Sequence, residues 1–552
     1  MGRTPLFTDV ARALRLARFC DENRLSTAEG LDRVRKAESD YVSVRQSRRE
    51  WLGTIAKAGA AGAAVAVLSP VDTLFALPQS PSIDVGIVGA GIAGLACADS
   101  LAAAGIIPAV YEADTRVGGR CLSLPDLFPG QVAERGGEFI DTPHKTMLRY
   151  ARRFNLALED VSKEPGEVFY HLEGELVPES VVVDEFRDFV QVIHVDLRRL
   201  SNEPTALAHT EADVVLDNTS LSAYLSGANG ANRAASPIAK AAITAAYIAE
   251  YGLEAEEQSC LNLLEFIHAD RRSKFTPFGV FSDERYHVLD GNDRIVSGLA
   301  EGLPRPVQLG MMLTAVTETS GGRIELTFST PAGLVSRTHD AVVLAIPFTT
   351  LRAVDINVDL NRVRGKREAI DQLGYGTNAK LMVGFERRPW IDWGGNGTAY
   401  SDLPNLLCTW ETNPTRATPT RGVLTDYAGG VRGAAMNAQN VQLEVNQYLA
   451  DLEYVFSGAS AAVRRVQGNA IAHLEHWPSN ALALGSYTCY RPGQFTTIAG
   501  LEGLPVGNLF FAGEHANSFY EWQGFMEGAA LSGIDAAAAI LKPARKIGRS
   551  SD

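Results

Sequence analysis

The chain of 552 residues exceeds the roughly 250 to 300 residues that one hydrophobic core supports, so we expect two packed regions. Hydrophobic residues make up 46% of it and charged residues 21%, which excludes a largely disordered or collagen-like protein. The formal net charge of −14 argues against a nucleic-acid partner, because phosphate binding needs a cationic surface, and solubility is its simplest explanation. The six cysteines lack the CxxC spacing of zinc and dithiol redox sites, so we expect neither a metal site nor a structural disulfide.

Residues 1–81 read as a leader and linker. Ser47-Arg48-Arg49-Glu50-Trp51-Leu52 is followed by residues 53–68, which are mostly Gly, Ala and Val with a single Lys57. That run is shorter than the about 20 apolar residues of a membrane-spanning helix. It resembles a twin-arginine signal, which predicts export of a folded, cofactor-loaded protein to the periplasm or the medium. The alternative is an amphipathic N-terminal helix with a flexible Ala/Gly linker in a cytoplasmic protein.

A dinucleotide-binding motif follows. The β-rich residues 82–88 run into Gly89-Ala90-Gly91-Ile92-Ala93-Gly94, and a helical stretch begins directly afterwards. Gly89 permits the tight turn, Gly91 lets the backbone approach a pyrophosphate, and Gly94 lets the helix pack closely on the strand. A second strand ends in Glu112, about 20 residues beyond the motif, where an acid can bind ribose hydroxyls. These features together predict a Rossmann-like nucleotide site.

Two further glycine turns indicate the class of nucleotide. Residues 112–120 read Glu-Ala-Asp-Thr-Arg-Val-Gly-Gly-Arg, and residues 134–140 read Glu-Arg-Gly-Gly-Glu-Phe-Ile. Both stretches resemble the flavin-containing amine oxidases, a family that includes monoamine oxidases, polyamine oxidases and L-amino acid oxidases. Such turns line the flavin in that family, so the resemblance implies that the cofactor is FAD.

The C-terminal region carries a second resemblance to the same family. Residues 509–515 read as a buried strand that ends in a turn, and Gly524-Phe525-Met526-Glu527-Gly528-Ala529 opens an Ala-rich helix. The resemblance implies that Glu514 binds the ribityl or pyrophosphate region of the cofactor. It also places the helix N-terminus, near Phe525 and Met526, against flavin N1 and O2, where a positive helix end stabilises the anionic reduced flavin.

The resemblance covers the chain from about residue 82 to about residue 541. The sequence departs from it at Asp290-Gly291, where the family usually has Gly-Gly, and Leu313 is expected to lie against the adenine. The residues implied to bind the cofactor are Gly89, Gly91, Ile92, Ala93, Gly94, Glu112, Ala113, Arg116, Gly119, Arg120, Gly136, Gly137, Glu138, Leu313, Gly513, Glu514, Gly524, Phe525 and Met526.

Three residues are expected to take part in the chemistry. Lys380, a charge within an apolar run, resembles the family lysine that holds a water against flavin N5 and helps oxygen to react; the alternative is an edge-strand lysine that reaches solvent. Tyr487 and Phe525 resemble the two rings of the family's substrate cage, which hold a neutral amine and exclude water; the alternative is core packing. Ser486 stands where monoamine oxidases carry the cysteine bonded to the flavin, so non-covalent FAD is expected, although nearby Cys489 leaves attachment open.

The substrate pocket is less clearly marked in the sequence. The residues expected to bind substrate are Glu138, Tyr487 and Trp522. The arginine that binds the substrate carboxylate in well-described L-amino acid oxidases is missing after Gly137. Glu138 and Asp141 would instead suit a cationic group, unless Asp141 caps a nearby helix. The unassigned groups that could form a different carboxylate clamp, and so favour an L-amino acid slightly, are Trp477, Tyr490 and Arg491.

We therefore predict an α/β protein with a Rossmann-like FAD-binding domain of the GR2 flavoprotein type and a substrate domain of mixed sheet and helices. The FAD domain takes residues 82–150, 285–345 and 500–543, the substrate domain takes 151–284 and 346–499, and 544–552 form a tail. The predicted reaction is oxidative deamination of an L-amino acid, including a basic one, to a 2-oxo acid, ammonia and hydrogen peroxide. The alternatives are a mono-, di- or polyamine oxidase that gives an aldehyde, a carotenoid-type desaturase and a non-catalytic flavin-binding protein. We expect no stable membrane span, and a homodimer is compatible with the sequence.

Overall fold

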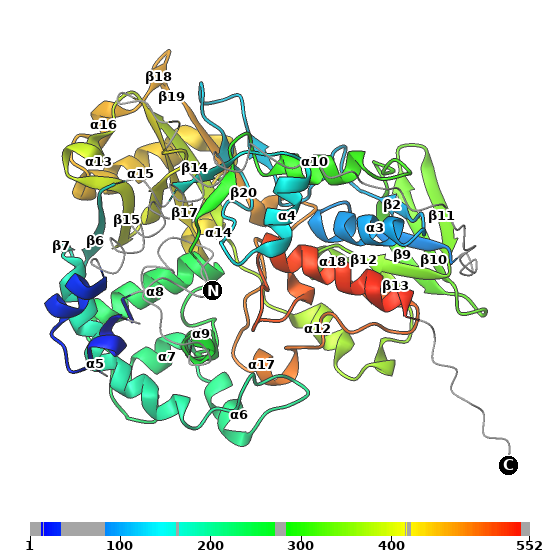
Figure 1. Cartoon of the computed structure of the whole chain (residues 1–552), viewed down its shortest axis with the longest axis horizontal. Coiled ribbons are helices and arrows are strands. Elements are labelled where there is room, and N and C mark those ends of the chain that lie inside the picture. The colour runs from blue at the N-terminus through cyan, green and yellow to red at the C-terminus, as the bar shows by residue number, and fades with distance from the viewer. Residues whose placement is uncertain are drawn as a thin grey trace, which may run out of the picture.

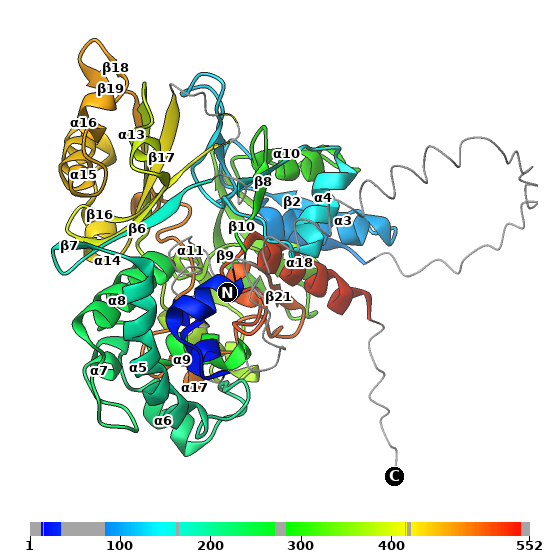
Figure 2. The same ribbon diagram turned by 60° about the vertical axis from the view of Figure 1, so that its left-hand side comes forward.

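The computed structural model of the chain describes residues 13–14, 16–21, 23–34, 83–161, 165–270, 283–414, 416 and 421–542. Two lobes that each contain a β-sheet lie side by side, and a group of helices packs beside one of them (Figure 1). The same division is visible in the view turned by 60° (Figure 2).

The first lobe is built on a four-stranded parallel sheet whose strands come from distant parts of the chain. The order is β2-β1-β12-β21, with all three strand pairs parallel. The strands are β1 (Val85–Val88), β2 (Ala109–Tyr111), β12 (Ala341–Leu344) and β21 (Leu509–Phe511). Nearly every residue in them is buried, as expected of a parallel sheet covered on both faces.

Two helices made largely of small residues pack on each other in this lobe. They are α3 (Ile92–Ala103) and α18 (Met526–Leu541). A Cβ atom on Gly533 of α18 would lie 2.0 Å from the carbonyl oxygen of Ala93, so the two helices approach too closely for a side chain there. The carboxylate of Glu527 accepts two backbone N–H groups of α4 (Lys145–Arg153) and thereby caps that helix.

A second sheet in the first lobe has the order β11-β10-β9-β13. Its strands are β9 (Met312–Glu318), β10 (Ile324–Thr330), β11 (Gly333–His339) and β13 (Asp355–Asn357). β13 pairs in parallel with β9, with Ile356 opposite Val316. β13, which follows the predicted boundary at residue 345, therefore forms one edge of this sheet, because it pairs with a strand about 40 residues upstream.

The second lobe contains a seven-stranded sheet of order β20-β14-β17-β16-β15-β6-β7. Its strands are β6 (Glu167–Leu172), β7 (Glu175–Val177), β14 (Ala379–Phe385), β15 (Gly395–Leu403), β16 (Leu406–Glu411), β17 (Gly422–Ala428) and β20 (Ala472–His476). Leu381 and Val383 of β14 share a core with Leu449 and Leu452 of α15 (Val441–Val455), which packs against the sheet. The expected fold class, a Rossmann-like domain plus a domain of mixed sheet and helices, is confirmed.

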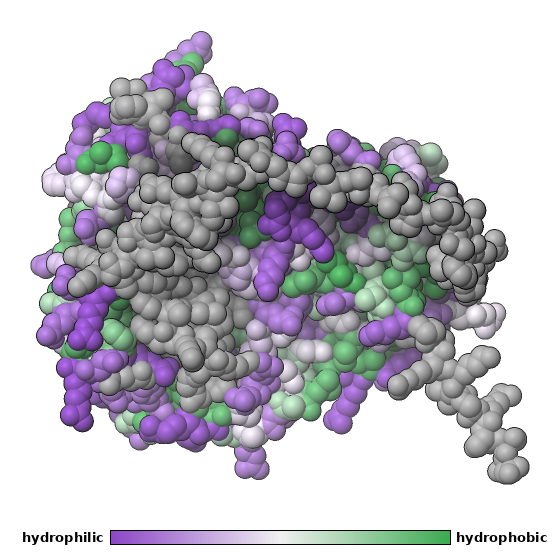
Figure 3. All heavy atoms as spheres, in the orientation of Figure 1, coloured by the Kyte–Doolittle hydropathy of each residue, from purple (hydrophilic) through white to green (hydrophobic). Residues whose placement is uncertain are grey.

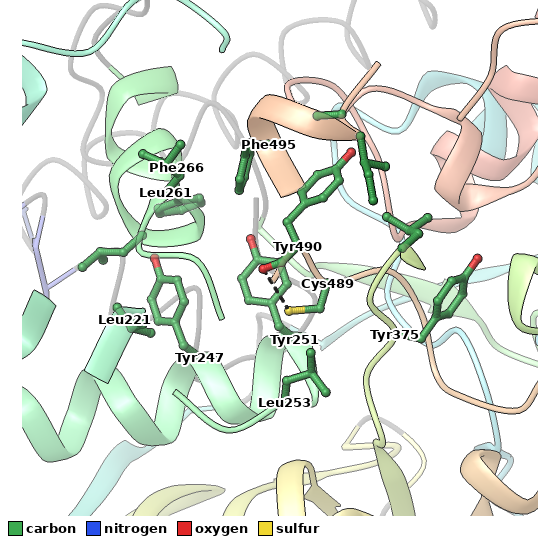
Figure 4. Packing of buried hydrophobic residues seen from close by; sticks show 14 of the residues in the cluster. Leu221, Tyr247, Tyr251, Leu253, Leu261, Phe266, Tyr375, Cys489, Tyr490 and Phe495 are labelled. Atoms are coloured by element: carbon green, nitrogen blue, oxygen red, sulfur yellow. Dashed lines mark hydrogen bonds between the residues drawn. The ribbon is translucent and has the colours of Figure 1, made fainter. Parts of the chain in front are cut away.

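The helical group completes this second lobe. Its helices are α5 (Glu179–Leu197), α6 (Glu211–Asp217), α7 (Leu221–Leu225), α8 (Pro237–Tyr251) and α9 (Leu261–Asp270). Tyr247 and Tyr251 of α8, Leu221 of α7 and Leu261 of α9 belong to one hydrophobic core (Figure 4). Ring centroids 5.8 Å apart place the two tyrosines in contact.

The described residues 13–14, 16–21 and 23–34, assigned to the leader from the sequence, include helical stretches that pack on α5. Leu14 is 3% exposed and Cys20 is fully buried. Arg187 of α5 binds the carboxylate of Asp21 at 3.0 Å. This part of the predicted leader therefore belongs to the folded protein, whereas the paired arginines and the apolar run after them lie outside the described residues.

The remaining helices and strands are short, and α10 is the longest of them. They are β3 (Ser123–Leu124), β4 (Ala133–Glu134), β5 (Leu158–Asp160), β8 (Tyr286–Val288), β18 (Arg465–Val466), β19 (Asn469–Ala470), α10 (Asp293–Glu301), α11 (Phe348–Leu351), α12 (Lys366–Gln372), α13 (Pro389–Asp392), α14 (Gly430–Ala435), α16 (Ala459–Ala462) and α17 (Gln494–Thr497). Hydrophilic residues are spread over the face shown in Figure 3. Within the described ranges no helix combines the length and apolar character needed to cross a bilayer.

Candidate active site

A cavity of about 470 Å³ lies between the two lobes. The carboxyl ends of all four strands of the parallel sheet reach it through Gly89, Glu112, Ala345 and Gly513. The other side comes from Lys380 of β14, Trp410 of β16 and Tyr427 of β17, together with residues of the segment 477–487. Open parallel sheets bind ligands outside the carboxyl ends of their strands, so the cavity lies where the fold favours a nucleotide.

The glycines of the first turn take two different parts in this cavity. Gly89 has a φ of +100°, and a Cβ atom on Gly94 would lie 1.9 Å from the carbonyl oxygen of Gly89. Gly94 does not line the cavity, because it packs α3 onto the turn. A Cβ atom on Gly91 would meet only the carbonyl oxygen of Gly118, at 3.9 Å, so Gly91 leaves bare backbone beside the cavity. The start of α3 has no side-chain cap, and its N–H groups fit a phosphate.

Glu112 fixes the shape of this turn. Its carboxylate accepts the backbone N–H of Ala90 at 2.7 Å and that of Asp114 at 2.9 Å. Glu112 also lines the cavity, so its carboxylate can be reached by the ribose hydroxyls of a bound nucleotide, as predicted. The site can therefore hold a nucleotide cofactor through the glycine backbone, the N-terminus of α3 and this acid.

Arg120 and Glu514 join three stretches that the sequence indicated separately. An Arg120 guanidinium nitrogen lies 3.0 Å from a Glu514 carboxylate oxygen and donates to the carbonyl oxygen of Ser486 at 2.6 Å. Glu514 also accepts the hydroxyl of Thr488 at 3.0 Å. Both charged residues line the cavity, and the ion pair holds the segment that carries Tyr487 against the glycine turns.

The other predicted cofactor residues converge on the same cavity. Those that line it are Ile92, Ala93, Ala113, Arg116, Gly119, Gly136, Gly137, Glu138, Leu313, Gly524, Phe525 and Met526. A Cβ atom on Gly136 would lie 1.7 Å from the carbonyl oxygen of Arg120, so this position requires glycine. We call Gly89, Gly91, Gly119 and Gly136 the glycine wall.

Lys380 lies in the cavity wall and not at a sheet edge, because β14 is flanked by β17 and β20. Its ammonium lies 2.5 Å from a carboxylate oxygen of Glu138 and donates to the carbonyl oxygen of Gly136 at 3.2 Å. The other Glu138 oxygen accepts the indole N–H of Trp410 at 2.9 Å. Both charged side chains are 4% exposed. The Glu138 charge, expected to receive a cationic substrate group, is thus already paired.

A row of aromatic side chains continues from this ion pair. The Tyr487 and Tyr427 hydroxyls lie 2.8 Å apart, and the Tyr427 ring lies 5.6 Å from that of Trp410. The Trp410 ring in turn lies 5.6 Å from that of Phe139. All four residues line the cavity, and we call them the aromatic wall. Phe525, the N-cap of α18, also lines the cavity.

Two residues expected near the substrate lie elsewhere. Trp522 does not line the cavity; its ring packs edge-on against His144, with centroids 4.4 Å apart. Asp141 is fully buried outside the cavity and accepts the backbone N–H of Glu284 at 3.0 Å. His144 also packs edge-on against Phe525 at 5.3 Å, so this buried group supports a cavity ring rather than binding substrate directly. Burial lowers the pKa of His144 to about 3.

The residues considered for a carboxylate clamp also separate. Trp477 lines the cavity and donates its indole N–H to the Arg135 carbonyl oxygen at 3.0 Å. Tyr490 is buried away from the cavity and donates its hydroxyl to Glu502, and Arg491 pairs with Glu257. Neither can hold a substrate carboxylate in this cavity, because both act in other contacts outside it.

Trp410 and Tyr427 line the cavity, although no sequence motif marks them. Each sits in an apolar strand without a motif, and only the sheet register brings them beside Lys380. Lys380 lies directly opposite Tyr427 between β14 and β17, so both side chains share one face. No local pattern in these two strands selects this face, because every residue of β17 and all but one residue of β16 are buried.

The charges along the cavity are arranged in pairs. Among the residues that the structure describes, the cations lining it are Arg116, Arg120 and Lys380. Arg116 lies 3.3 Å from Asp114, and the other two pair with Glu514 and Glu138. Among these lining residues every cation therefore has an acidic partner.

Comparisons with known proteins agree with this geometry. The sequence profile of the family described as flavin containing amine oxidoreductase matches residues 92–541, well over half of the chain. An L-amino-acid oxidase of Naja atra is 22% identical over 84% of this chain and 88% of its own length. A flavin-containing amine oxidase of Danio rerio is 24% identical over 83% of this chain and 85% of its own length.

Solved structures show the same fold. Cyclohexylamine oxidase from Brevibacterium oxydans IH-35A aligns with a TM-score of 0.69 at 21% identity, over 83% of this chain and 99% of that protein. Wild-type putrescine oxidase bound to putrescine aligns with a TM-score of 0.68 at 20% identity, over 84% of this chain and 99% of that protein.

Proposed function

Because this chain belongs to the flavin containing amine oxidoreductase family and is a flavin-dependent amine oxidase, we propose that it binds FAD non-covalently and oxidises an amine without a carboxylate. The observation that carries the proposal is one cavity with the glycine wall and the aromatic wall on its surface. The first suits the cofactor and the second suits an apolar amine.

Non-covalent binding is supported by the surroundings of the candidate cysteines. Ser486 takes the position of the attachment cysteine, and its hydroxyl donates to the Asn378 side chain at 2.6 Å. Cys489 is buried and does not line the cavity. Cys121 does line it, but burial raises the pKa of its thiol well above the usual value, so the nucleophilic thiolate is disfavoured.

The glycine wall, the N-terminus of α3 and Glu112 would hold FAD, which would supply the acceptor for the hydride on the carbon beside the amino group and a route for its electrons to oxygen. The chain's own residues bind and orient the reactants. The aromatic wall and Phe525 exclude water, which favours the neutral amine over its ammonium form. Lys380, anchored by Glu138 and the Gly136 carbonyl oxygen, provides a fixed N–H donor for a water. The imine product then hydrolyses in water to an aldehyde or ketone and ammonia.

The paired cations favour an amine over an amino acid. A substrate carboxylate needs an unpaired donor, and each cation lining the described cavity already has an acidic partner. An L-amino acid is the second candidate, because the Naja atra relative is an L-amino-acid oxidase. In that case the products are a 2-oxo acid, ammonia and hydrogen peroxide.

A peroxide and ammonia assay on matched pairs tests this choice. We expect phenethylamine and tryptamine to have higher kcat/KM values than L-phenylalanine and L-tryptophan, which differ from them only by the carboxylate. Cadaverine and L-lysine extend the comparison to substrates with a second cation. Faster turnover of the amino acid in every pair would refute the amine assignment. A bound flavin that no amine or amino acid reduces would favour a desaturase or a non-catalytic flavoprotein.

The cellular location is a separate proposal. We propose export by the twin-arginine route on the basis of residues 47–68, which lie outside the described residues. Fractionation of cells that produce the native chain or the Arg48→Lys, Arg49→Lys variant tests it. Export should be lost in the variant, and equal cytoplasmic activity of both proteins would refute it.

A further inference from the structure

We propose that the Glu138–Lys380 ion pair sets the substrate class by cancelling its own charge, so that the site selects amines whose remaining groups are uncharged. This inference rests on the proposed function and adds a selectivity role to two cavity residues. It excludes both a substrate carboxylate and a second substrate ammonium.

The hydrogen bonds of the pair leave little capacity for a charged ligand. One oxygen of Glu138 accepts from Lys380 at 2.5 Å and the other accepts from Trp410 at 2.9 Å. Lys380 also donates to the Gly136 carbonyl oxygen at 3.2 Å. A charged substrate group would therefore have to displace one member of the pair, and each of the two side chains is only 4% exposed.

Burial makes this displacement costly. The attraction between opposite charges is several times stronger in a partly buried site than in bulk water. Removing one member of such a pair leaves an uncompensated buried charge, which a ligand of the missing sign can neutralise. Loss of the Glu138 charge should thus invite anions, and loss of the Lys380 charge should invite cations.

The pair is placed to act on substrate because it adjoins the aromatic wall. Lys380 faces Tyr427 across the β14–β17 pair, and its ammonium lies 5.8 Å from the Trp410 ring centroid. Glu138 comes from the other lobe, directly after the Gly136-Gly137 turn. The charge at this wall is consequently the sum of two residues that come from different lobes.

Equilibrium binding of three unreactive probes with the same shape tests the inference. Benzoate, benzamide and benzamidine present an anion, a neutral amide and a cation on one phenyl ring. Their Kd values are measured on the FAD-loaded protein from changes in the flavin absorbance spectrum and from ligand-induced shifts in Tm. We expect the wild type to bind benzamide more tightly than either charged probe.

The single variants should move in opposite directions. In Glu138→Gln the benzoate-to-benzamidine affinity ratio should rise about tenfold, and in Lys380→Met it should fall about tenfold. The double variant Glu138→Gln, Lys380→Met restores neutrality, so its ratio should return toward the wild-type value. The double variant also removes the unpaired buried charge, and so keeps the test informative where a single variant folds poorly.

Equal ratios in all variants that fold, or shifts of both single variants in the same direction, would overturn the inference. Failure of the proposed function looks different, because the wild-type flavin would then remain oxidised with every amine. Probe binding and amine reduction are separate readouts, so the two failures are distinguishable.

Discussion

The glycine wall and the aromatic wall enclose the same cavity but are built in different ways. The glycine wall comes from short contiguous turns in which backbone conformation and close packing fix the residue type. The aromatic wall combines Phe139 with Trp410 of β16, Tyr427 of β17 and Tyr487 of a later turn, which lie far apart in the sequence. The glycine wall, which suits the cofactor, can therefore be predicted from short sequence motifs. The aromatic wall, which suits the substrate, depends on how distant strands pair in the folded protein.

The largest expected effect separates the two kinds of glycine in the first turn. Gly94→Ala places a Cβ atom 1.9 Å from the Gly89 carbonyl oxygen, so we expect loss of folded, flavin-loaded protein. Gly91→Ala has only one atom within reach, at 3.9 Å, so we expect an intact fold with FAD affinity lowered about tenfold or more. Circular dichroism measures the fold, and titration with FAD measures the affinity.

Gly321→Ala is a matched control for Gly91→Ala. Gly321 also lacks a positive φ, has one atom 4.0 Å from a Cβ atom, and does not line the cavity, so the control tests the added methyl group alone. Similar FAD affinity in Gly91→Ala and the control would contradict the role given to Gly91.

The second expected effect concerns the reaction with oxygen. Lys380→Met removes the ammonium anchored at the cavity, and we expect reoxidation of the reduced flavin to slow about 100-fold while FAD stays bound. Stopped-flow mixing of the anaerobically reduced protein with oxygen measures this rate. The double variant with Glu138→Gln serves as control, because it lacks the ammonium without leaving Glu138 unpaired. Unchanged reoxidation in both proteins would remove the role assigned to Lys380.

The sequence allowed the fold and most of the residues that line the glycine side of the cavity to be predicted, because glycine requirements are local. Gly91 and Gly136 stand in motifs whose spacing alone indicates a nucleotide turn. Glu138 lines the cavity, but the sequence does not reveal that its charge is paired, because its partner Lys380 lies 242 residues away. Trp410 could not be found at all, since strand register and not spacing brings it to the cavity.

The N-terminal region shows a second limit of local reading. The described residues 13–14, 16–21 and 23–34 precede a signal-like segment, so the sequence alone groups them with a leader. Their place is set instead by apolar burial of Leu14 and Cys20 and by the Arg187–Asp21 ion pair with α5. None of these contacts leaves a motif in the sequence, because each joins residues that are far apart in the chain.

The third effect is on pH-dependent stability near Phe525. Burial lowers the pKa of His144 in the folded protein to about 3. Between about pH 6.5 and about pH 3 the imidazole therefore binds a proton in the unfolded chain but stays neutral in the folded protein. The His144 contribution is therefore fully present above pH 6.5 and declines as the pH falls, by up to about 1.4 kcal/mol per pH unit. His144→Phe keeps a ring beside Phe525 and removes the titration.

Urea unfolding of the wild type and His144→Phe at about pH 7.5, 6 and 5 measures the difference in their free energies of unfolding. These values lie above and within the pH range in which that difference should change. The variant should lose stability less steeply than the wild type toward acid pH. Parallel curves for the two proteins would show that His144 does not stay neutral in the folded state.

The smallest effect concerns the hydroxyl pair of the aromatic wall. Tyr427→Phe removes the 2.8 Å contact with Tyr487 and keeps both rings, so we expect kcat/KM for a good amine to fall about threefold to tenfold. Tyr454→Phe is a control, because Tyr454 is 65% exposed and does not line the cavity. An equal loss in both variants would show that the hydroxyl pair does not order the wall.

An amine bound at the aromatic wall should reduce a flavin bound at the glycine wall. The decisive measurement is anaerobic mixing of the purified yellow protein with phenethylamine, followed by its visible absorption spectrum. We expect the oxidised flavin band to bleach, and to return with release of hydrogen peroxide when air is admitted. A protein that carries no FAD, or whose flavin stays oxidised with every amine and amino acid, would contradict this expectation.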